Sequence, residues 1–182
     1  MKLSVREIAL CALFIALIAI GAFIRIPVGS DVYTLQFLFT LLAGLILGAR
    51  LGAMCVAAYI LMGLLGIPVF AAGGGLGYVL QPTFGYLIGF IVQAWIVGNL
   101  SRRNGRQTAF RRLFVINLIG LGIVYLIGIT WFYLATNYIL QTPLSLWAAL
   151  FYCGLLQLPP DVFLCIGAAM LAERCQKAGV WL

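Results

Sequence analysis

The sequence contains no histidine and few charged residues. Of its 182 residues, 65% are hydrophobic, 8% are charged and only four are acidic. A soluble domain carries roughly 25% charged residues, so this composition excludes an ordinary soluble enzyme. The lack of histidine also removes a common acid/base catalyst and the commonest metal ligand. The sequence therefore predicts an all-α integral membrane protein.

Sequence motifs of common catalytic sites are also missing. The chain has no GxxxxGK[ST] phosphate loop, no GxGxxG fingerprint, no GxSxG elbow and no HExxH helix. Its five cysteines include no CxxC pair, so neither a zinc site nor a disulfide framework is indicated. We expect these cysteines to be small buried residues. We therefore expect no enzymatic activity, no catalytic residues, no metal site, no cofactor and no ATP hydrolysis by the chain itself.

Six apolar runs are present, and a membrane helix needs about 20 apolar residues. The second and third runs are short and are separated by Gly48, Ala49 and Arg50, which predicts a helical hairpin. A cleaved signal peptide is the alternative for the first run, but a signal peptide is not followed by further spans. We expect one domain, residues 1–182, with six transmembrane helices. The runs cover residues 8–24, 35–47, 51–65, 82–100, 113–134 and 146–172.

Residues 66–81 interrupt this pattern. They contain Pro68 and glycines at 73, 74, 75 and 77, which disfavour a helix interior. Irregular backbone at membrane depth needs protein or a water-filled cavity around it. We therefore expect this loop to fold back over the bundle. Pro82 is expected in the first turn of the helix that follows, and Pro159-Pro160 is expected to interrupt the last helix.

The basic residues predict the orientation. With six spans and a cytoplasmic N-terminus, ten of the eleven cations lie inside and only Arg25 lies outside, as the positive-inside rule requires. We therefore assign the net charge of +7 to topology rather than to nucleic-acid binding, and place both termini in the cytoplasm. The cluster at residues 102–112 is either an anchor near anionic headgroups or a docking site for a cytosolic partner. The ten are Lys2, Arg6, Arg50, Arg102, Arg103, Arg106, Arg111, Arg112, Arg174 and Lys177.

Asp161 is the most informative side chain. An ionisable group within a span costs roughly 2.5–3.5 kcal/mol on insertion scales and indicates a functional site. It follows Pro159-Pro160, where backbone hydrogen bonds are lost, and its carboxylate suits a ligand that donates N–H groups. The alternative is a structural hydrogen bond with Asn117 or Gln93. Further polar residues are expected in the same half of the membrane, namely Thr34, Gln36, Gln81, Thr83, Tyr86, Asn137, Tyr138 and Gln141.

Three stretches resemble one known family. Residues 66–71 read GIPVFA and residues 81–90 read QPTFGYLIGF, close to the G-L-P-V-F-A and G-P-T-G-G-Y-L-x-G-F motifs of the BioY family. Residues 34–36 (TLQ) and 159–161 (PPD) are similar to that family's TLQ and PGD elements. BioY proteins are the biotin-binding S components of energy-coupling-factor (ECF) transporters. The resemblance implies the S-component fold, biotin as ligand and location in the cell membrane.

The resemblance also implies roles for particular residues. It assigns the ligand pocket to Asp161, Tyr86, Thr83, Gln36 and the loop glycines Gly73, Gly74 and Gly75. It assigns Ala12 and Ala16, a small-xxx-small pair, to contact with a transmembrane coupling subunit, whose two cytosolic ATPases use the ATP. Packing within the bundle is the alternative for this pair.

The sequence departs from the family motifs at several positions. Leu164 stands where the family usually has a lysine, Val32 replaces a proline, and Gln81 and Phe84 replace glycines. Arg25, the one external cation, either meets the ligand's carboxylate instead or is an interfacial anchor. Two other functions stay open, namely the same fold with another vitamin such as lipoate, and an intramembrane scaffold without transport.

Overall fold

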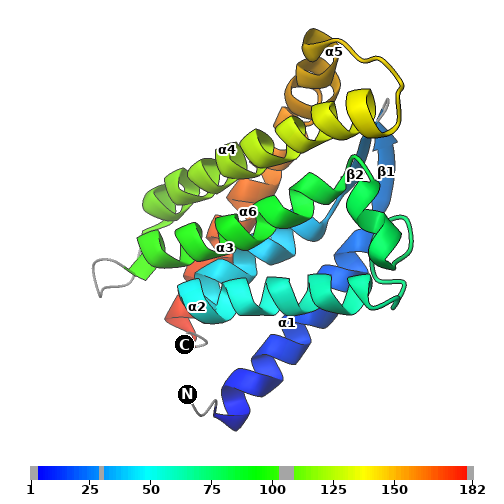
Figure 1. The fold of residues 1–182 in the computed structure, drawn as a ribbon. Coiled ribbons are helices and arrows are strands. Elements are labelled where there is room, and N and C mark those ends of the chain that lie inside the picture. Colours follow the sequence, from blue (N-terminus) through cyan, green and yellow to red (C-terminus); the bar gives the residue numbers. More distant parts are fainter. Residues whose placement is uncertain (1–3, 29–30, 103–108, 180–182) are drawn as a thin grey trace.

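The computed structural model describes residues 4–28, 31–102 and 109–179, and the described chain is almost entirely helical (Figure 1). This confirms the all-α prediction. Five helical stretches are long and apolar enough to cross a membrane, namely Val5–Phe23, Gln36–Leu64, Phe84–Arg102, Phe110–Ile139 and Leu146–Lys177. The helices are α1 (Val5–Phe23), α2 (Gln36–Leu64), α3 (Phe84–Arg102), α4 (Phe110–Leu134), α5 (Leu146–Leu150) and α6 (Leu158–Lys177).

Helix α2 reverses direction at Gly48, as the sequence predicts. Gly48 has φ 82° and ψ 179°, far from helical values. Gln36 and Tyr59, 23 residues apart, are joined by a 2.8 Å hydrogen bond, whereas a straight helix would separate them by about 35 Å. The two arms pack closely, because a Cβ on Gly52 would lie 2.8 Å from the Ala43 carbonyl oxygen. Figure 1 shows the chain doubling back at this point.

Small residues bring this hairpin close to α3. A Cβ on Gly44 would lie 2.9 Å from the Cα of Ala94. Arg102, at the end of α3, donates from Nη2 to the Ile46 carbonyl oxygen at 3.0 Å, beside the turn. Small residues allow close backbone approach between membrane helices, where packing replaces the hydrophobic effect. The hairpin and α3 therefore form the centre of the bundle.

Helix α1 lies at the edge of the bundle. Its N-terminus is fixed by a capping box in which Ser4 and Glu7 exchange side-chain and backbone hydrogen bonds. Along its 19 residues only four positions are buried: Phe14, Ile18, Gly21 and Ala22. Most of its surface is therefore available to lipid or to a partner.

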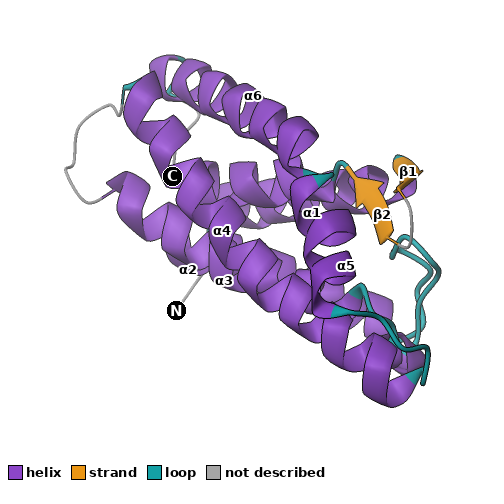
Figure 2. Ribbon diagram, turned by 90° about the horizontal axis from the view of Figure 1, so that it is seen from above, coloured by secondary structure: helices purple, strands orange, loops and turns teal. Residues whose placement is uncertain are grey.

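The irregular segments gather at one end of the bundle (Figure 2). The strands β1 (Arg25–Val28) and β2 (Asp31–Thr34) form a two-stranded antiparallel hairpin in which Arg25 pairs with Thr34. The sequence did not predict these strands. The loop after α2 includes a 3₁₀ turn, η1 (Leu76–Leu80). Together these segments cover that end of the helices.

Two helix boundaries differ from the sequence prediction. Helix α3 begins at Phe84, so Pro82 precedes the helix rather than occupying its first turn. The irregularity expected at Pro159-Pro160 lies earlier, in the π-helical turn η3 (Phe151–Leu155). The two prolines occupy the first turn of α6, where missing N–H groups cost little.

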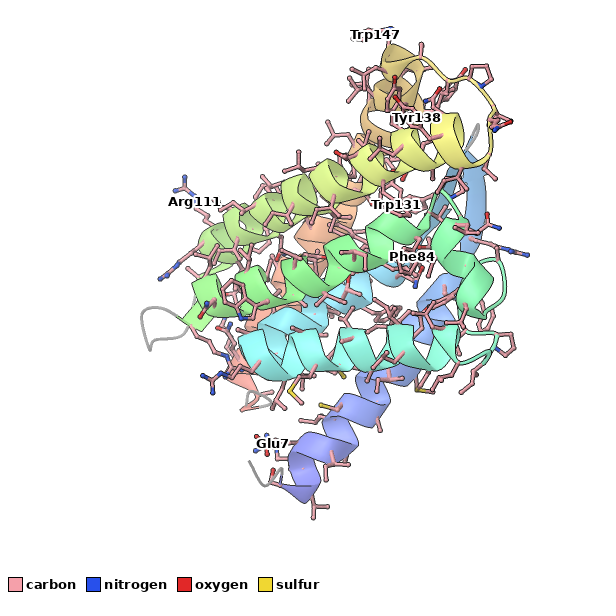
Figure 3. All side chains as sticks on the ribbon, in the orientation of Figure 1. Glu7, Phe84, Arg111, Trp131, Tyr138 and Trp147 are labelled. Carbon is pink, nitrogen blue, oxygen red and sulfur yellow. The ribbon has the colours of Figure 1, made fainter. Side chains whose placement is uncertain are left out.

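The two ends of the bundle differ in their side chains. Arg111 lies at the start of α4, at the end opposite Tyr138 and Trp147 (Figure 3). Tyr138 and Trp147 are 73% and 76% exposed, as is typical of aromatic residues at a membrane interface. Arg6 donates to the Gly179 carbonyl oxygen at 3.3 Å, so the start of α1 and the end of α6 meet. Lys2, Arg103 and Arg106 lie outside the described residues.

Candidate functional site

A cavity of about 100 Å³ lies beneath the β-hairpin and the 66–83 loop. Side chains from β1, β2, α2, α3, α4 and α6 line it, so it is built from most of the bundle. Five of the eight predicted ligand residues line it, namely Arg25, Gln36, Thr83, Tyr86 and Asp161, and so does Thr34. The structure thus brings together residues that are up to 136 positions apart in the chain (Arg25 to Asp161).

Asp161 lies in the first turn of α6 and is 5% exposed. Its carboxylate oxygen Oδ2 accepts a 2.7 Å hydrogen bond from the Tyr125 hydroxyl of α4. Its backbone N–H donates to the Gln157 carbonyl oxygen at 3.2 Å. The N-terminal turn of a helix stabilises negative charge, and a charge-assisted hydrogen bond offsets part of the desolvation cost.

The alternative partners considered for Asp161 make other hydrogen bonds. Asn117 donates from Nδ2 to the Cys165 carbonyl oxygen at 2.9 Å. The side-chain oxygen of Gln93 accepts from the Thr40 hydroxyl at 3.3 Å. These bonds hold α4 to α6 and α2 to α3. Asp161 instead lines the cavity, in the same wall as Tyr125.

Tyr33 of β2 brings the hairpin to the same carboxylate. Burial raises the pKa of the Tyr33 hydroxyl to about 12, and the negative charge of Asp161 adds to the increase. The hydroxyl therefore stays protonated at neutral pH. Tyr33 lines the cavity, so a neutral phenol and a carboxylate share this part of the wall.

Gln36 is held by hydrogen bonds that run from the cavity wall through Tyr59 to Val69. Its Nε2 donates to the Tyr59 hydroxyl at 2.8 Å, and that hydroxyl donates to the Val69 carbonyl oxygen at 2.7 Å. Its Oε1 accepts from Thr34 at 3.4 Å. Gln36 is 4% exposed. Its amide is therefore fixed in the cavity wall and ties that wall to the 66–83 loop.

Arg25 and Asp161 are the two charged residues among the described residues that line the cavity. Arg25 is exposed, and its guanidinium donates to the Ala71 carbonyl oxygen. That bond joins β1 to the loop. Ala71 and Ala72 line the cavity beside it. The cavity is consequently dipolar, with a buried anion and an exposed cation.

Tyr86 and Thr83 form part of the cavity wall near the start of α3. The Tyr86 ring lies directly against Gly128 of α4, where any added Cβ would overlap the ring. The Thr83 and Tyr78 hydroxyls are 3.2 Å apart and share a hydrogen bond. Tyr78 also packs on Phe70, with ring centroids 4.5 Å apart. Aromatic rings therefore supply much of the apolar surface near this wall.

The three loop glycines do not appear among the residues that line the cavity. Gly73 and Gly75 have φ of 109° and 102°, which side chains rarely adopt. A Cβ on Gly74 would overlap the Ile67 carbonyl oxygen and lie 2.9 Å from that of Gly63. In this structure they shape the loop rather than the cavity surface.

The cavity also contains residues that sequence reasoning missed. Tyr125 carried a usable signal, because it places a hydroxyl in the middle of an apolar run. The other aromatic residues gave no such signal, since aromatic residues are common throughout the chain. The missed aromatic and polar residues are Tyr33, Phe37, Tyr78, Phe90, Tyr125 and Gln157.

The remaining predicted residues lie elsewhere. Ala12 and Ala16 are exposed on the outer face of α1, with Ala9 one turn away, rather than packed in the bundle. Asn137 stabilises the α4–α5 connection. Its side-chain Nδ2 donates to the Leu144 carbonyl oxygen, and its Oδ1 accepts from the Leu144 N–H. Leu164 packs against the hydrophobic core and does not appear among the cavity-lining residues.

Fold and site together define a multi-pass membrane protein with a cavity at one end of a helical bundle, in which a carboxylate and a guanidinium lie among aromatic walls. The BioY family model matches residues 1–179, and the chain belongs to the BioY family. A probable biotin transporter BioY of Lysinibacillus sphaericus is 43% identical, over 96% of this chain and 88% of its own length. A probable biotin transporter BioY of Pyrococcus horikoshii is 38% identical, over 96% of this chain and 98% of its own length. Relatives named as transporters agree with the expectation of a protein that is not an enzyme.

The fold also matches a solved structure. The crystal structure of the S-component for biotin from an ECF-type ABC transporter aligns with a TM-score of 0.82 and 26% identity. The alignment covers 95% of this chain and 92% of that one. The resemblance found in the sequence motifs is therefore confirmed along nearly the full chain.

Gly74→Ala should lower the apparent melting temperature in detergent, because the new methyl group overlaps the Ile67 carbonyl oxygen. Overpacking of this kind costs about 1–3 kcal/mol. The matched control is Gly77→Ala, since a Cβ at Gly77 meets no atom within 4 Å. Equal melting temperatures for the two variants would contradict the tight packing of Gly74.

Proposed function

We propose that this protein is the S component that captures biotin at the external face for ATP-driven uptake by an ECF transporter. One observation carries the proposal: a single cavity combines a buried carboxylate, an exposed guanidinium and aromatic walls in a member of the BioY family. Biotin presents two ureido N–H donors, an apolar thiophane ring and a carboxylate tail. Each part of biotin has a counterpart in the cavity.

Asp161 is the proposed acceptor for the ureido group. A carboxylate accepts hydrogen bonds at about four positions, so it can hold Tyr125 and a ureido N–H together. Bonds of this charge-assisted kind contribute roughly 1.5–3 kcal/mol each. Tyr86, Phe37 and Phe90 supply apolar surface for the thiophane. Lipoate has no N–H donors, so it would offer the Asp161 carboxylate no hydrogen bond from the ligand.

Arg25 is the proposed partner of the biotin carboxylate. The lysine that the family usually carries three residues after the aspartate is replaced here by Leu164, which packs against the hydrophobic core. Arg25 is the cation among the described residues that line the cavity. Its planar guanidinium suits bidentate recognition of a carboxylate.

The proposed topology has six membrane crossings, because α2 doubles back at Gly48 and contributes two short ones. The cationic end, with Arg111 and the meeting point of Arg6 and Gly179, faces the cytoplasm. The end that carries the β-hairpin and the cavity faces outward. Both termini are then cytoplasmic, and the bilayer surrounds the helices.

The proposed partners are a transmembrane coupling subunit and its two cytosolic ATPases. Ala12 and Ala16 lie exposed on a helix that has only four buried positions. A small-residue face on a membrane helix allows a second helix to approach closely. The protein itself needs no cofactor in this scheme, since ATP is used by the partner subunits.

Asp161→Asn should weaken biotin binding by at least tenfold. The amide is neutral and presents an NH₂ group that opposes the ureido N–H donors, so the charge-assisted bond is lost. Titration calorimetry on the purified full chain measures the change. Unchanged affinity would remove Asp161 from the binding site, and tighter binding of lipoate than biotin would reject biotin as the ligand.

Arg25→Gln is the companion variant for the other end of the ligand. It should weaken binding of biotin but leave binding of biotin methyl ester unchanged, because the ester has no carboxylate charge. Asp161→Asn should weaken both ligands. If Arg25→Gln affects biotin and its ester equally, Arg25 supports the loop through Ala71 instead of binding the carboxylate.

Substitution of both Ala12 and Ala16 by leucine should abolish biotin uptake in cells that contain the ECF module. Added bulk on the exposed face blocks close helix approach, while biotin binding by the purified variant should stay unchanged. Leu13→Phe adds bulk beside that face, at a residue that is 52% exposed, and should retain uptake. Loss of binding in the double variant would indicate packing within the bundle.

A fusion of green fluorescent protein to the C-terminus should be fluorescent, and a fusion of alkaline phosphatase at the same place should be inactive. Both results follow if the C-terminus is cytoplasmic. Fusions made after Gln141, between α4 and α5, should behave in the opposite way. Active phosphatase at the C-terminus would overturn the proposed orientation.

A further inference from the structure

We infer that Tyr125 is a positioning residue, whose hydroxyl fixes the Asp161 carboxylate toward the ligand and whose ring separates the binding cavity from a lipid-facing groove. This inference rests on the proposed function, since it assigns a partner to Asp161 in biotin capture. Tyr125 belongs to none of the motifs that carried the family resemblance. The geometry around its side chain carries the argument.

The hydroxyl side of Tyr125 faces the cavity. The Tyr125 hydroxyl donates to Asp161 Oδ2 at 2.7 Å, a length typical of a strong charge-assisted hydrogen bond. The bond joins α4 to α6 between residues 36 positions apart. Tyr125 and its neighbour Val124 both line the cavity. The phenol is therefore a fixed part of the wall that contains the carboxylate.

The ring of Tyr125 also lines a second space. An apolar groove of about 620 Å³ runs between α4 and the segment from α5 through η3 to the start of α6. Gly122 of α4 and Gly154 of η3 line it with Tyr125, together with leucines on both sides. Tyr125 is thus shared by the cavity that contains Asp161 and by an apolar groove. Its ring keeps hydrocarbon away from a buried carboxylate.

The backbone around Asp161 explains why a side-chain partner matters here. The π-helical turn η3 and two prolines precede it, so the start of α6 is not a continuation of a regular helix. The Asp161 N–H is already bonded to Gln157, which fixes the main chain but not the carboxylate. Tyr125 supplies an anchor from a different helix. A fixed carboxylate binds more tightly because less side-chain freedom is lost on binding.

Tyr125→Phe tests this directly, because it removes one oxygen and keeps the ring. We expect biotin affinity to fall about tenfold or more, with the same loss for biotin methyl ester, since the ureido end is affected. In the Asp161→Asn background the same substitution should change affinity less than twofold. The matched control is Tyr133→Phe, on the same helix and lining the groove but not the cavity, which should bind like wild type.

The outcomes separate the inference from the proposed function. If wild type binds no biotin, the proposed function fails. If wild type binds biotin and Tyr125→Phe binds equally well, or if the two substitutions are additive, only the positioning role is overturned. A general loss of structure would weaken binding in the wild-type and Asp161→Asn backgrounds alike, whereas the positioning role predicts the loss only where the Asp161 carboxylate is present.

Should Tyr125→Phe not be recovered folded, infrared spectra of wild type and Asp161→Asn provide a second test that leaves residue 125 intact. Exchange of a carboxylate acceptor for an amide should shift the C–O stretching band of one tyrosine. Identical tyrosine bands in the two proteins would overturn the inference.

Discussion

The reversal of α2 at Gly48 is the constraint on which the rest of the structure depends. It converts one 29-residue helical stretch into two arms, and it brings Tyr59 on the second arm to Gln36 on the first. The same hydroxyl then reaches Val69, which fixes the start of the loop that covers the cavity. A side chain at Gly48 would need a positive φ and would also collide with the Arg102 guanidinium. The cavity wall, its cover and the central helix pair therefore all depend on one glycine.

The second organising feature is the separation of charge within an apolar bundle. The described cavity lining contains one carboxylate and one guanidinium, and most other described cations lie at the opposite end. A buried charge is costly unless it is hydrogen-bonded. Asp161 meets this cost through the helix N-terminus and Tyr125. The scarcity of competing charge agrees with the proposed ligand, which carries donors at one end and an anion at the other.

Much of the fold could be predicted from the sequence, because apolar runs and glycine positions act locally. The two short apolar runs on either side of Gly48, Ala49 and Arg50 predicted the reversal, and the cation distribution predicted two unlike ends. The β-hairpin at Arg25 and the π-helical turn at Phe151–Leu155 were not predicted, since both are short local features that the pattern of apolar runs does not show. Of the predicted ligand residues, those identified by charge or motif, such as Asp161 and Gln36, line the cavity. Tyr125 offered a signal as a hydroxyl within an apolar run, but its contact with residue 161 depends on the packing of α4 against α6, which local sequence does not show.

The loop glycines show why a motif does not by itself define a contact. Gly73 and Gly75 adopt positive φ, and Gly74 packs against two carbonyl oxygens, so the motif encodes a backbone shape. That shape places the Ala71 carbonyl oxygen where Arg25 donates to it, and so holds the β-hairpin over the cavity. A motif can thus act through the position of a neighbouring element rather than through its own atoms. Gln36 and Tyr59 are also hydrogen-bonded to the loop, through the Val69 carbonyl oxygen. The cavity wall and the loop that covers it therefore form one hydrogen-bonded unit.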